Sequence, residues 1–219
     1  QAVSKAQIHT GKTLRRLRSN KRIIIDIMCG RRSLAKYYLS QDSNAVIICI
    51  DRRDKEDALA DIPRHYLSRV RYVQMDAIHL DYECLKRILR QQCHANIDEV
   101  YHMHASPDCT TYSLAHSART AYRDEHGVIR TDIPRWKQEL ARRHDKVMST
   151  IVWTIRTAAV ANKYMVCTIE NPVGKWAMQP VVKDCLQSTS GSTWRLLRTD
   201  YCSAAVRRFD AHLPWTKKP

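Results

Sequence analysis

Residues 23–30 read Ile-Ile-Ile-Asp-Ile-Met-Cys-Gly, and this stretch decides the fold that the sequence predicts. A short, continuous apolar run of this kind is typical of a strand that is buried on both faces of a parallel sheet. Cys29-Gly30 can turn the chain, and Ser33 can cap a helix that continues to about Ser40. A buried strand followed at once by a turn and a helix predicts the first βα unit of an α/β domain.

The same alternation of apolar runs and amphipathic stretches continues along the chain. Further strands are expected at 45–50, 70–75, 97–103 and 164–169 and near 194–201. Helices are expected at 54–67, from an Asp81 cap through Leu89, at 137–161 and near 179–187. The stretch 137–161 has the clearest helical period, and we expect its apolar stripe and Trp153 in the core. Strands that alternate with helices at this spacing predict an α/β fold, a single Rossmann-like domain with a mainly parallel sheet.

The charge of the chain points to a polyanionic partner. The 219 residues include 37 Lys and Arg against 22 Asp and Glu, a net charge of +15. Such a surplus favours nucleic acid as the partner. Residues 1–21 are expected to form a basic helix or arm, and residues 22–216 the main domain. No apolar run approaches the length of a membrane span, so no membrane association is expected.

The eight cysteines contain no C-x-x-C pair, which argues against a zinc ribbon or a thioredoxin-type site. Several lie inside apolar runs, as reduced thiols of an intracellular protein do. We therefore expect no metal. The expected location is the nucleus in a eukaryote, or the cytoplasm in a bacterium or phage.

Acidic and reactive residues follow the predicted strands. In chain order these are Asp26 with Gly30, Asp51, Asp76, Cys109 and Glu170. Carboxyl ends of parallel strands share one edge of a sheet, so these groups should line a common crevice. Asp51 is placed to accept hydrogen bonds from ribose hydroxyls, and Asp76 or a neighbouring backbone group to meet an adenine edge. Taken alone, each acid is equally well explained as a helix cap, and Cys109 as one more buried thiol.

These motifs resemble, in the same order, those of cytosine-5 DNA methyltransferases, most closely the compact phage-type members. The resemblance rests on residues 26–30, Asp51, Asp76, the run 106–113 (Ser-Pro-Asp-Cys-Thr-Thr-Tyr-Ser) and Glu170-Asn171-Pro172. Tyr201-Cys202 and Trp215-Thr216 also find counterparts, so the match spans about residues 22–216.

The resemblance implies S-adenosylmethionine as the cofactor and DNA as the substrate. It makes Cys109 the nucleophile that adds to carbon 6 of cytosine, and Glu170 the group that contacts ring nitrogen 3. The implied cofactor-binding residues are Asp26, Met28, Cys29, Gly30, Asp51, Asp76 and Pro107. The implied substrate-binding residues are Ser113, Arg119, Arg123, Asn171, Pro172, Arg207 and Arg208, with Arg119 and Arg123 assisting base flipping.

The sequence departs from the family pattern at three places. Arg31-Arg32 follow Gly30, where a second glycine is usual, and Met28 replaces a common phenylalanine. Asp108 takes the place of a proline, and a carboxylate beside a thiol raises the thiol pKa unless a cation compensates. We consider His102, His104 and Arg207 as possible compensators.

Target recognition is the least defined function. After Trp215 there is no room for a sizeable target-recognition domain, so we expect that the basic N-terminal arm or a protein partner supplies this function, or that sequence selectivity is poor. Two alternatives stay open. One is a cytosine-5 methyltransferase that acts on RNA. The other is a catalytically degenerate homologue that only binds nucleic acid, an alternative that Arg31-Arg32 favours.

Overall fold

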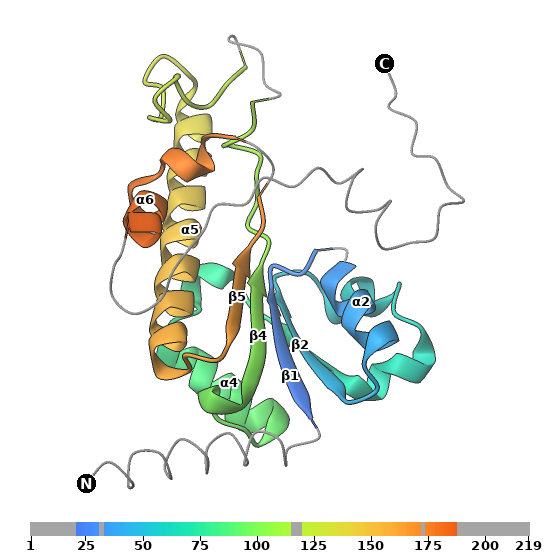
Figure 1. Ribbon diagram of the computed structural model, residues 1–219. Helices are drawn as coiled ribbons and strands as arrows, with labels where there is room; N and C mark the ends of the chain where they lie inside the picture. The colour runs from blue at the N-terminus through green and yellow to red at the C-terminus, as the bar shows by residue number, and fades with distance from the viewer. Residues whose placement is uncertain (1–20, 31–32, 115–119, 172–173, 188–219) are drawn as a thin grey trace, which may run out of the picture.

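The structure is a computed structural model that describes residues 21–30, 33–114, 120–171 and 174–187. Within these residues the chain forms one five-stranded parallel sheet with helices packed against it (Figure 1). The predicted α/β, Rossmann-like fold is confirmed. The expected basic arm, apart from Lys21, and the expected strand near 194–201 lie outside the described residues.

The strands follow the apolar runs of the sequence. They are β1 (Arg22–Ile27), β2 (Ala45–Asp51), β3 (Val70–Gln74), β4 (Val100–Ala105) and β5 (Val166–Ile169), in the order β3-β2-β1-β4-β5. All neighbouring pairs are parallel. The expected start of the fourth strand at 97 was three residues early, because Ile97–Glu99 form a short 3-10 turn, η3.

The helices agree with the predictions except in one segment. They are α2 (Ser33–Gln41), α3 (Lys55–Leu59), α4 (Tyr82–Cys93), α5 (Arg135–Ala161) and α6 (Pro180–Gln187), with 3-10 turns η1 (Arg64–Arg69), η2 (Ala77–His79) and η4 (Lys175–Met178). The predicted helix at 54–67 was wrong. It divides into α3 and η1 at Ile62-Pro63, because proline has no N–H and holds the preceding residue outside the helical region.

The side chains of β1 alternate between two hydrophobic layers. Ile25 and Ile27 pack in the layer that contains α4 and α5, while Ile24 packs with Leu39 of α2 on the other face. Figure 1 shows α2 on one side of the sheet and α4 and α5 on the other. Burial on both faces explains why the strands read as continuous apolar runs rather than as alternating ones.

Trp153 is not a core residue, contrary to the prediction. It is 61% exposed, whereas Ile151, Val152 and Ile155 of the same helix are fully buried. Two residues beyond Ile151 is about 200° around a helix, which points Trp153 away from the sheet. The Arg156 guanidinium lies 5.3 Å from the centre of its ring.

The strand order reverses between β1 and β4, and this places the candidate site. From β1 the chain proceeds outward through β2 to β3, whereas β4 and β5 lie on the other side. Ligands of open parallel sheets bind outside the carboxyl ends of the strands at such a switch point. The turn Met28–Gly30 and the loop that begins at Ser106 therefore form the two sides of a crevice.

No helix in the described part of the chain is both long and apolar enough to cross a membrane.

Candidate active site

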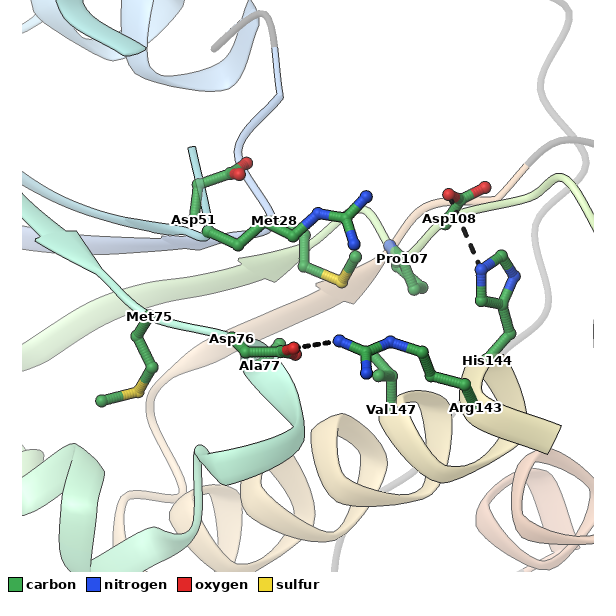
Figure 2. A pocket seen from close by; sticks show the side chains of 11 residues that line it. Met28, Asp51, Met75, Asp76, Ala77, Pro107, Asp108, Arg143, His144 and Val147 are labelled. Atoms are coloured by element: carbon green, nitrogen blue, oxygen red, sulfur yellow. Dashed lines mark hydrogen bonds and ion pairs between the residues drawn. The ribbon is translucent and has the colours of Figure 1, made fainter. Parts of the chain in front are cut away.

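A small cavity lies at the carboxyl edge of the sheet, where the turn after β1 meets the loop after β4 (Figure 2). Four of the residues predicted to bind a cofactor line it: Met28, Asp51, Asp76 and Pro107. Three basic side chains that the sequence did not single out also line it: Arg52, Arg143 and His144. The structure therefore brings together residues from β2, from the turns after β1, β3 and β4, and from α5.

Asp51 is held at the end of β2 by the turn that follows β1. Its Oδ2 accepts the backbone N–H of Gly30 at 3.0 Å, and its Oδ1 accepts that of Arg53 at 3.2 Å. Gly30 reaches this position with a φ of +48°, a left-handed conformation that glycine adopts without strain. The carboxylate is thereby fixed toward one end of the cavity.

Asp26 lies away from the cavity, unlike Asp51. It sits within β1, is 2% exposed, and is level with Cys49 of β2 and His104 of β4. Neither Asp26 nor Cys29 nor Gly30 is among the cavity-lining residues. Gly30 acts instead through its hydrogen bond to Asp51.

Cys109 lies in a compact loop directly after β4. The backbone N–H groups of Tyr112 and Ser113 both donate to its carbonyl oxygen, at 2.9 and 3.0 Å. The Oδ1 atom of Asp108 accepts the N–H and the hydroxyl of Thr110, at 2.8 and 2.6 Å. Burial of Asp108 works against its charge, but these bonds, with His144 and Arg52 nearby, hold the pKa of that carboxyl below its usual value.

The surroundings of Cys109 disfavour its thiolate. Burial raises the pKa of the thiol, and the charges of Asp108 and Glu170 raise it further. His102 and His104 do not compensate, contrary to the expectation, because burial lowers the pKa of each to about 4 and leaves them neutral near pH 7. Arg207 lies outside the described residues.

His144 connects α5 to the cysteine loop. Its Nδ1 is 3.1 Å from the Thr111 hydroxyl, and its Nε2 is 3.8 Å from Oδ2 of Asp108 (Figure 2). Burial lowers the pKa of this imidazole, partly offset by the charge of Asp108. At neutral pH the contact of His144 with Asp108 therefore serves mainly to hold the cysteine loop in position.

Arg123 was predicted to contact nucleic acid, and this prediction was wrong. The residue is 2% exposed, and its guanidinium binds both carboxylate oxygens of Asp145, at 2.7 and 3.3 Å. It also donates to the backbone carbonyls of Thr111, Gly127 and Ala141. Arg123 is thus a buried structural cation that ties the loop after Cys109 to α5.

The remaining predicted residues are placed as follows. Asn171 donates its side-chain N–H to the carbonyl of Pro107 at 2.9 Å, which joins the loops after β4 and β5. Glu170 follows β5, and its N–H donates to the Ala105 carbonyl at 2.9 Å. Ser113 forms an isolated antiparallel bridge with Gly174. Arg119, Pro172, Arg207 and Arg208 lie outside the described residues.

A row of hydrogen-bonded polar side chains crosses β4 and β5. Tyr38 Oη is 2.9 Å from His102 Nδ1, and His102 Nε2 is 2.8 Å from Thr168 Oγ1. The same Thr168 oxygen is 2.7 Å from His104 Nδ1, whose Nε2 is 2.9 Å from Ser106 Oγ. The row ends one residue before Pro107. Among the described residues, no group of three or more His, Cys, Asp or Glu could hold a metal ion.

No family model and no curated protein matches the sequence. Solved structures with a similar fold include the YIR035C short chain dehydrogenase/reductase of Saccharomyces cerevisiae, with a TM-score of 0.48 and 14% identity over 75% of this chain and 61% of that one. They also include a short-chain dehydrogenase/reductase of Burkholderia vietnamiensis (0.41, 13%, 77% and 74%) and the aminoglycoside resistance methyltransferase NpmB1 (0.35, 8%, 79% and 77%). This chain spans 61% of the yeast protein's length. Likeness at this level indicates neither a reaction nor a cofactor.

The Arg123–Asp145 pair generates a stability prediction. Replacing Arg123 with Met should lower the free energy of unfolding by about 3 kcal/mol, because Asp145 loses its buried partner and three carbonyls lose a donor. The matched control is Arg135→Met, which removes an exposed ion pair with Glu139 and should cost less than about 0.5 kcal/mol. Urea denaturation measures both changes, and equal midpoints for the two variants would contradict the prediction.

The buried imidazoles predict a pH-dependent stability. His102 and His104 have a pKa of about 4 in the folded protein, whereas an unperturbed histidine has a pKa of 6.5, so the unfolded chain binds their protons first as the pH falls. Stability should therefore be complete above about pH 6.5 and decline toward pH 4, by on the order of 2 kcal/mol for each imidazole. His104→Gln, which cannot titrate, should flatten this decline in urea titrations at several pH values. A variant with the same slope as the wild type would refute the role of His104.

Proposed function

We propose that this domain transfers a methyl group from S-adenosylmethionine to carbon 5 of cytosine in DNA. The observation that carries the proposal is the cavity at the switch point, where Met28, Asp51, Asp76 and Pro107 meet beside the Cys109 loop. A nucleoside site and a cysteine within reach of a carboxylate are what this chemistry requires. The sequence resemblance to cytosine-5 methyltransferases supplies the identity of the reaction.

The residues around the cavity suit an adenosyl cofactor in chemical character. Asp51 presents a fixed carboxylate at the end of β2 that can accept from ribose hydroxyls. Met28 and Pro107 offer apolar surface, and the Asp76 carboxylate can accept a hydrogen bond from the amino group of adenine. The cofactor, when bound, supplies an electrophilic methyl group on a sulfonium.

Cys109 and Glu170 divide the work on the base. The Cys109 thiol loses its proton to solvent and its sulfur bonds to carbon 6, while Glu170 protonates ring nitrogen 3. Carbon 5 then becomes nucleophilic enough to take the methyl group. Loss of the carbon 5 proton to solvent and of the sulfur from carbon 6 as a thiolate re-forms the ring double bond, and nitrogen 3 returns its proton to Glu170, which frees Cys109.

Nucleic acid as the partner is supported by the net charge of +15. Because Arg123 is buried, it is not one of the cations that contact the substrate. Contacts that select a target are therefore proposed to come from other basic residues or from a protein partner. An RNA substrate is a variant of the same proposal, and matched substrates distinguish the two.

A second candidate is a homologue that binds nucleic acid without catalysis. The raised pKa of the Cys109 thiol favours it, because neither His102 nor His104 offsets the charge of Asp108 near neutral pH. The two candidates differ in whether Cys109 can form a covalent bond with the base.

The covalent step provides the first test. Wild-type protein, S-adenosylmethionine and DNA that carries 5-fluorocytosine at every cytosine should form a complex that survives denaturing electrophoresis. Cys109→Ser should form none, while the control Cys93→Ser, altered on α4, should form as much as the wild type. An adduct with Cys109→Ser would refute the assignment of the nucleophile. The same assay with matched RNA decides between the two substrates.

Removing the neighbouring carboxylate provides the second test. Asp108→Asn should lower the pKa of the Cys109 thiol, so the rate of its alkylation by iodoacetamide should rise at a lower pH than in the wild type. Burial is the larger cause of the raised pKa and is unchanged in this variant. The pH at which the alkylation rate is half-maximal should therefore move only part of the way toward that of an ordinary cysteine. Mass spectrometry of the Cys109 peptide measures the rate. Asp132→Asn, an exposed carboxylate paired with Arg130, is the control and should not move the midpoint.

A further inference from the structure

Arg143 reaches from α5 to Asp76 across the cavity, and Figure 2 shows the ion pair between the two side chains. We propose that Arg143 sets the affinity of the site for its nucleoside cofactor by competing with that cofactor for Asp76. This inference rests on the proposed function. Arg143 is then a residue that determines cofactor affinity, a role that the sequence of the helix does not reveal.

The two carboxylate oxygens of Asp76 have different partners. Its Oδ1 accepts the backbone N–H of Ile78 at 3.1 Å and caps η2, while its Oδ2 pairs with the Arg143 guanidinium. The bond to Ile78 belongs to the turn and has to persist for the turn to keep its shape. Oδ2 is therefore the oxygen that a ligand would use, and Arg143 holds it.

The size of the cavity carries the second step. Its volume is about 60 Å³, which is room for a few water molecules, whereas pockets that enclose drug-sized ligands have ~300–1,000 Å³. Arg143 is one of the side chains that line this small space, and its guanidinium is paired with Asp76 there. A nucleoside can reach Asp76 only after this guanidinium moves away.

Arg143 has a way out of the cavity. Its side chain is 45% exposed, and that of Asp76 is 27% exposed, so the guanidinium can turn to water without crossing the core. An ion pair with this exposure is weak enough for a ligand to displace. Removing it should tighten ligand binding by about two- to fivefold, the range expected for a partly exposed pair.

The dependence of ligand affinity on salt provides a second measurement, and its expected direction is unusual. Salt screens an ion pair that is open to solvent, so raising the ionic strength weakens the competitor. S-adenosylhomocysteine carries no net charge near neutral pH, which makes it a suitable probe. Its affinity for the wild type should rise with salt, and this dependence should vanish once Arg143 is replaced.

The experiment is calorimetry with S-adenosylhomocysteine at low and high salt. Arg143→Met should bind about two- to fivefold more tightly than the wild type and without the rise with salt. The matched control is Arg142→Met, the neighbouring residue of α5, which lies outside the cavity lining and should bind like the wild type. In an Asp76→Asn background, Arg143→Met should give no gain, because the shared partner is gone. Circular dichroism of each variant checks that it is folded.

The outcomes separate the inference from the proposed function. Wild type that binds the probe while Arg143→Met binds equally or more weakly overturns the inference and leaves the proposed function standing. A gain that persists in the Asp76→Asn background also overturns it. Binding by neither protein overturns both, because the cavity would then not be a site for this nucleoside.

Discussion

The ion pair between the buried Arg123 and the partly exposed Asp145 is the contact on which the arrangement of the site depends. Asp145 belongs to the long helix α5, and Arg123 stacks on the ring of Tyr112, whose hydroxyl also donates to Asp145. Through Tyr112 and Arg123, the Asp145 carboxylate thus joins α5, the residues after Cys109 and the irregular segment around Gly127. Because a buried charge without its partner is costly, these three pieces keep their places together.

The same helix supplies a second set of contacts from the two residues just before Asp145. Arg143 and His144 project from α5 toward Asp76 and Asp108, the acids that follow β3 and β4 (Figure 2). α5 therefore contacts the edge of the sheet from outside, while Gly30, in the turn after β1, orients Asp51. The shape of the cavity depends on both, because α5 contacts Asp76 and Asp108 while the turn after β1 holds Asp51.

Most of the fold could be predicted from the sequence, since strands buried on both faces leave continuous apolar runs and α5 leaves a regular stripe. The site was predictable only in part. Residues that directly follow strands were found, but Arg123 reads like any arginine of a polar loop, and nothing local reveals its burial. Arg143 pairs with Asp76 across 67 residues, a contact that only the tertiary fold creates. The prediction that Trp153 lies in the core was wrong, because its position on α5 faces solvent.

The row of side chains from Tyr38 to Ser106 has a consequence for the direction of its hydrogen bonds. Each hydroxyl and each neutral imidazole in it can donate only one hydrogen, so there are two orders in which every bond of the row runs in the same direction. If Tyr38 donates at one end, Ser106 accepts at the other and keeps its own hydrogen for another partner. If Ser106 donates, both imidazoles carry their hydrogen on the opposite nitrogen and Tyr38 accepts. In these two orders the tautomers of His102 and His104 match, and the row links a hydroxyl on α2 to a hydroxyl beside the Cys109 loop.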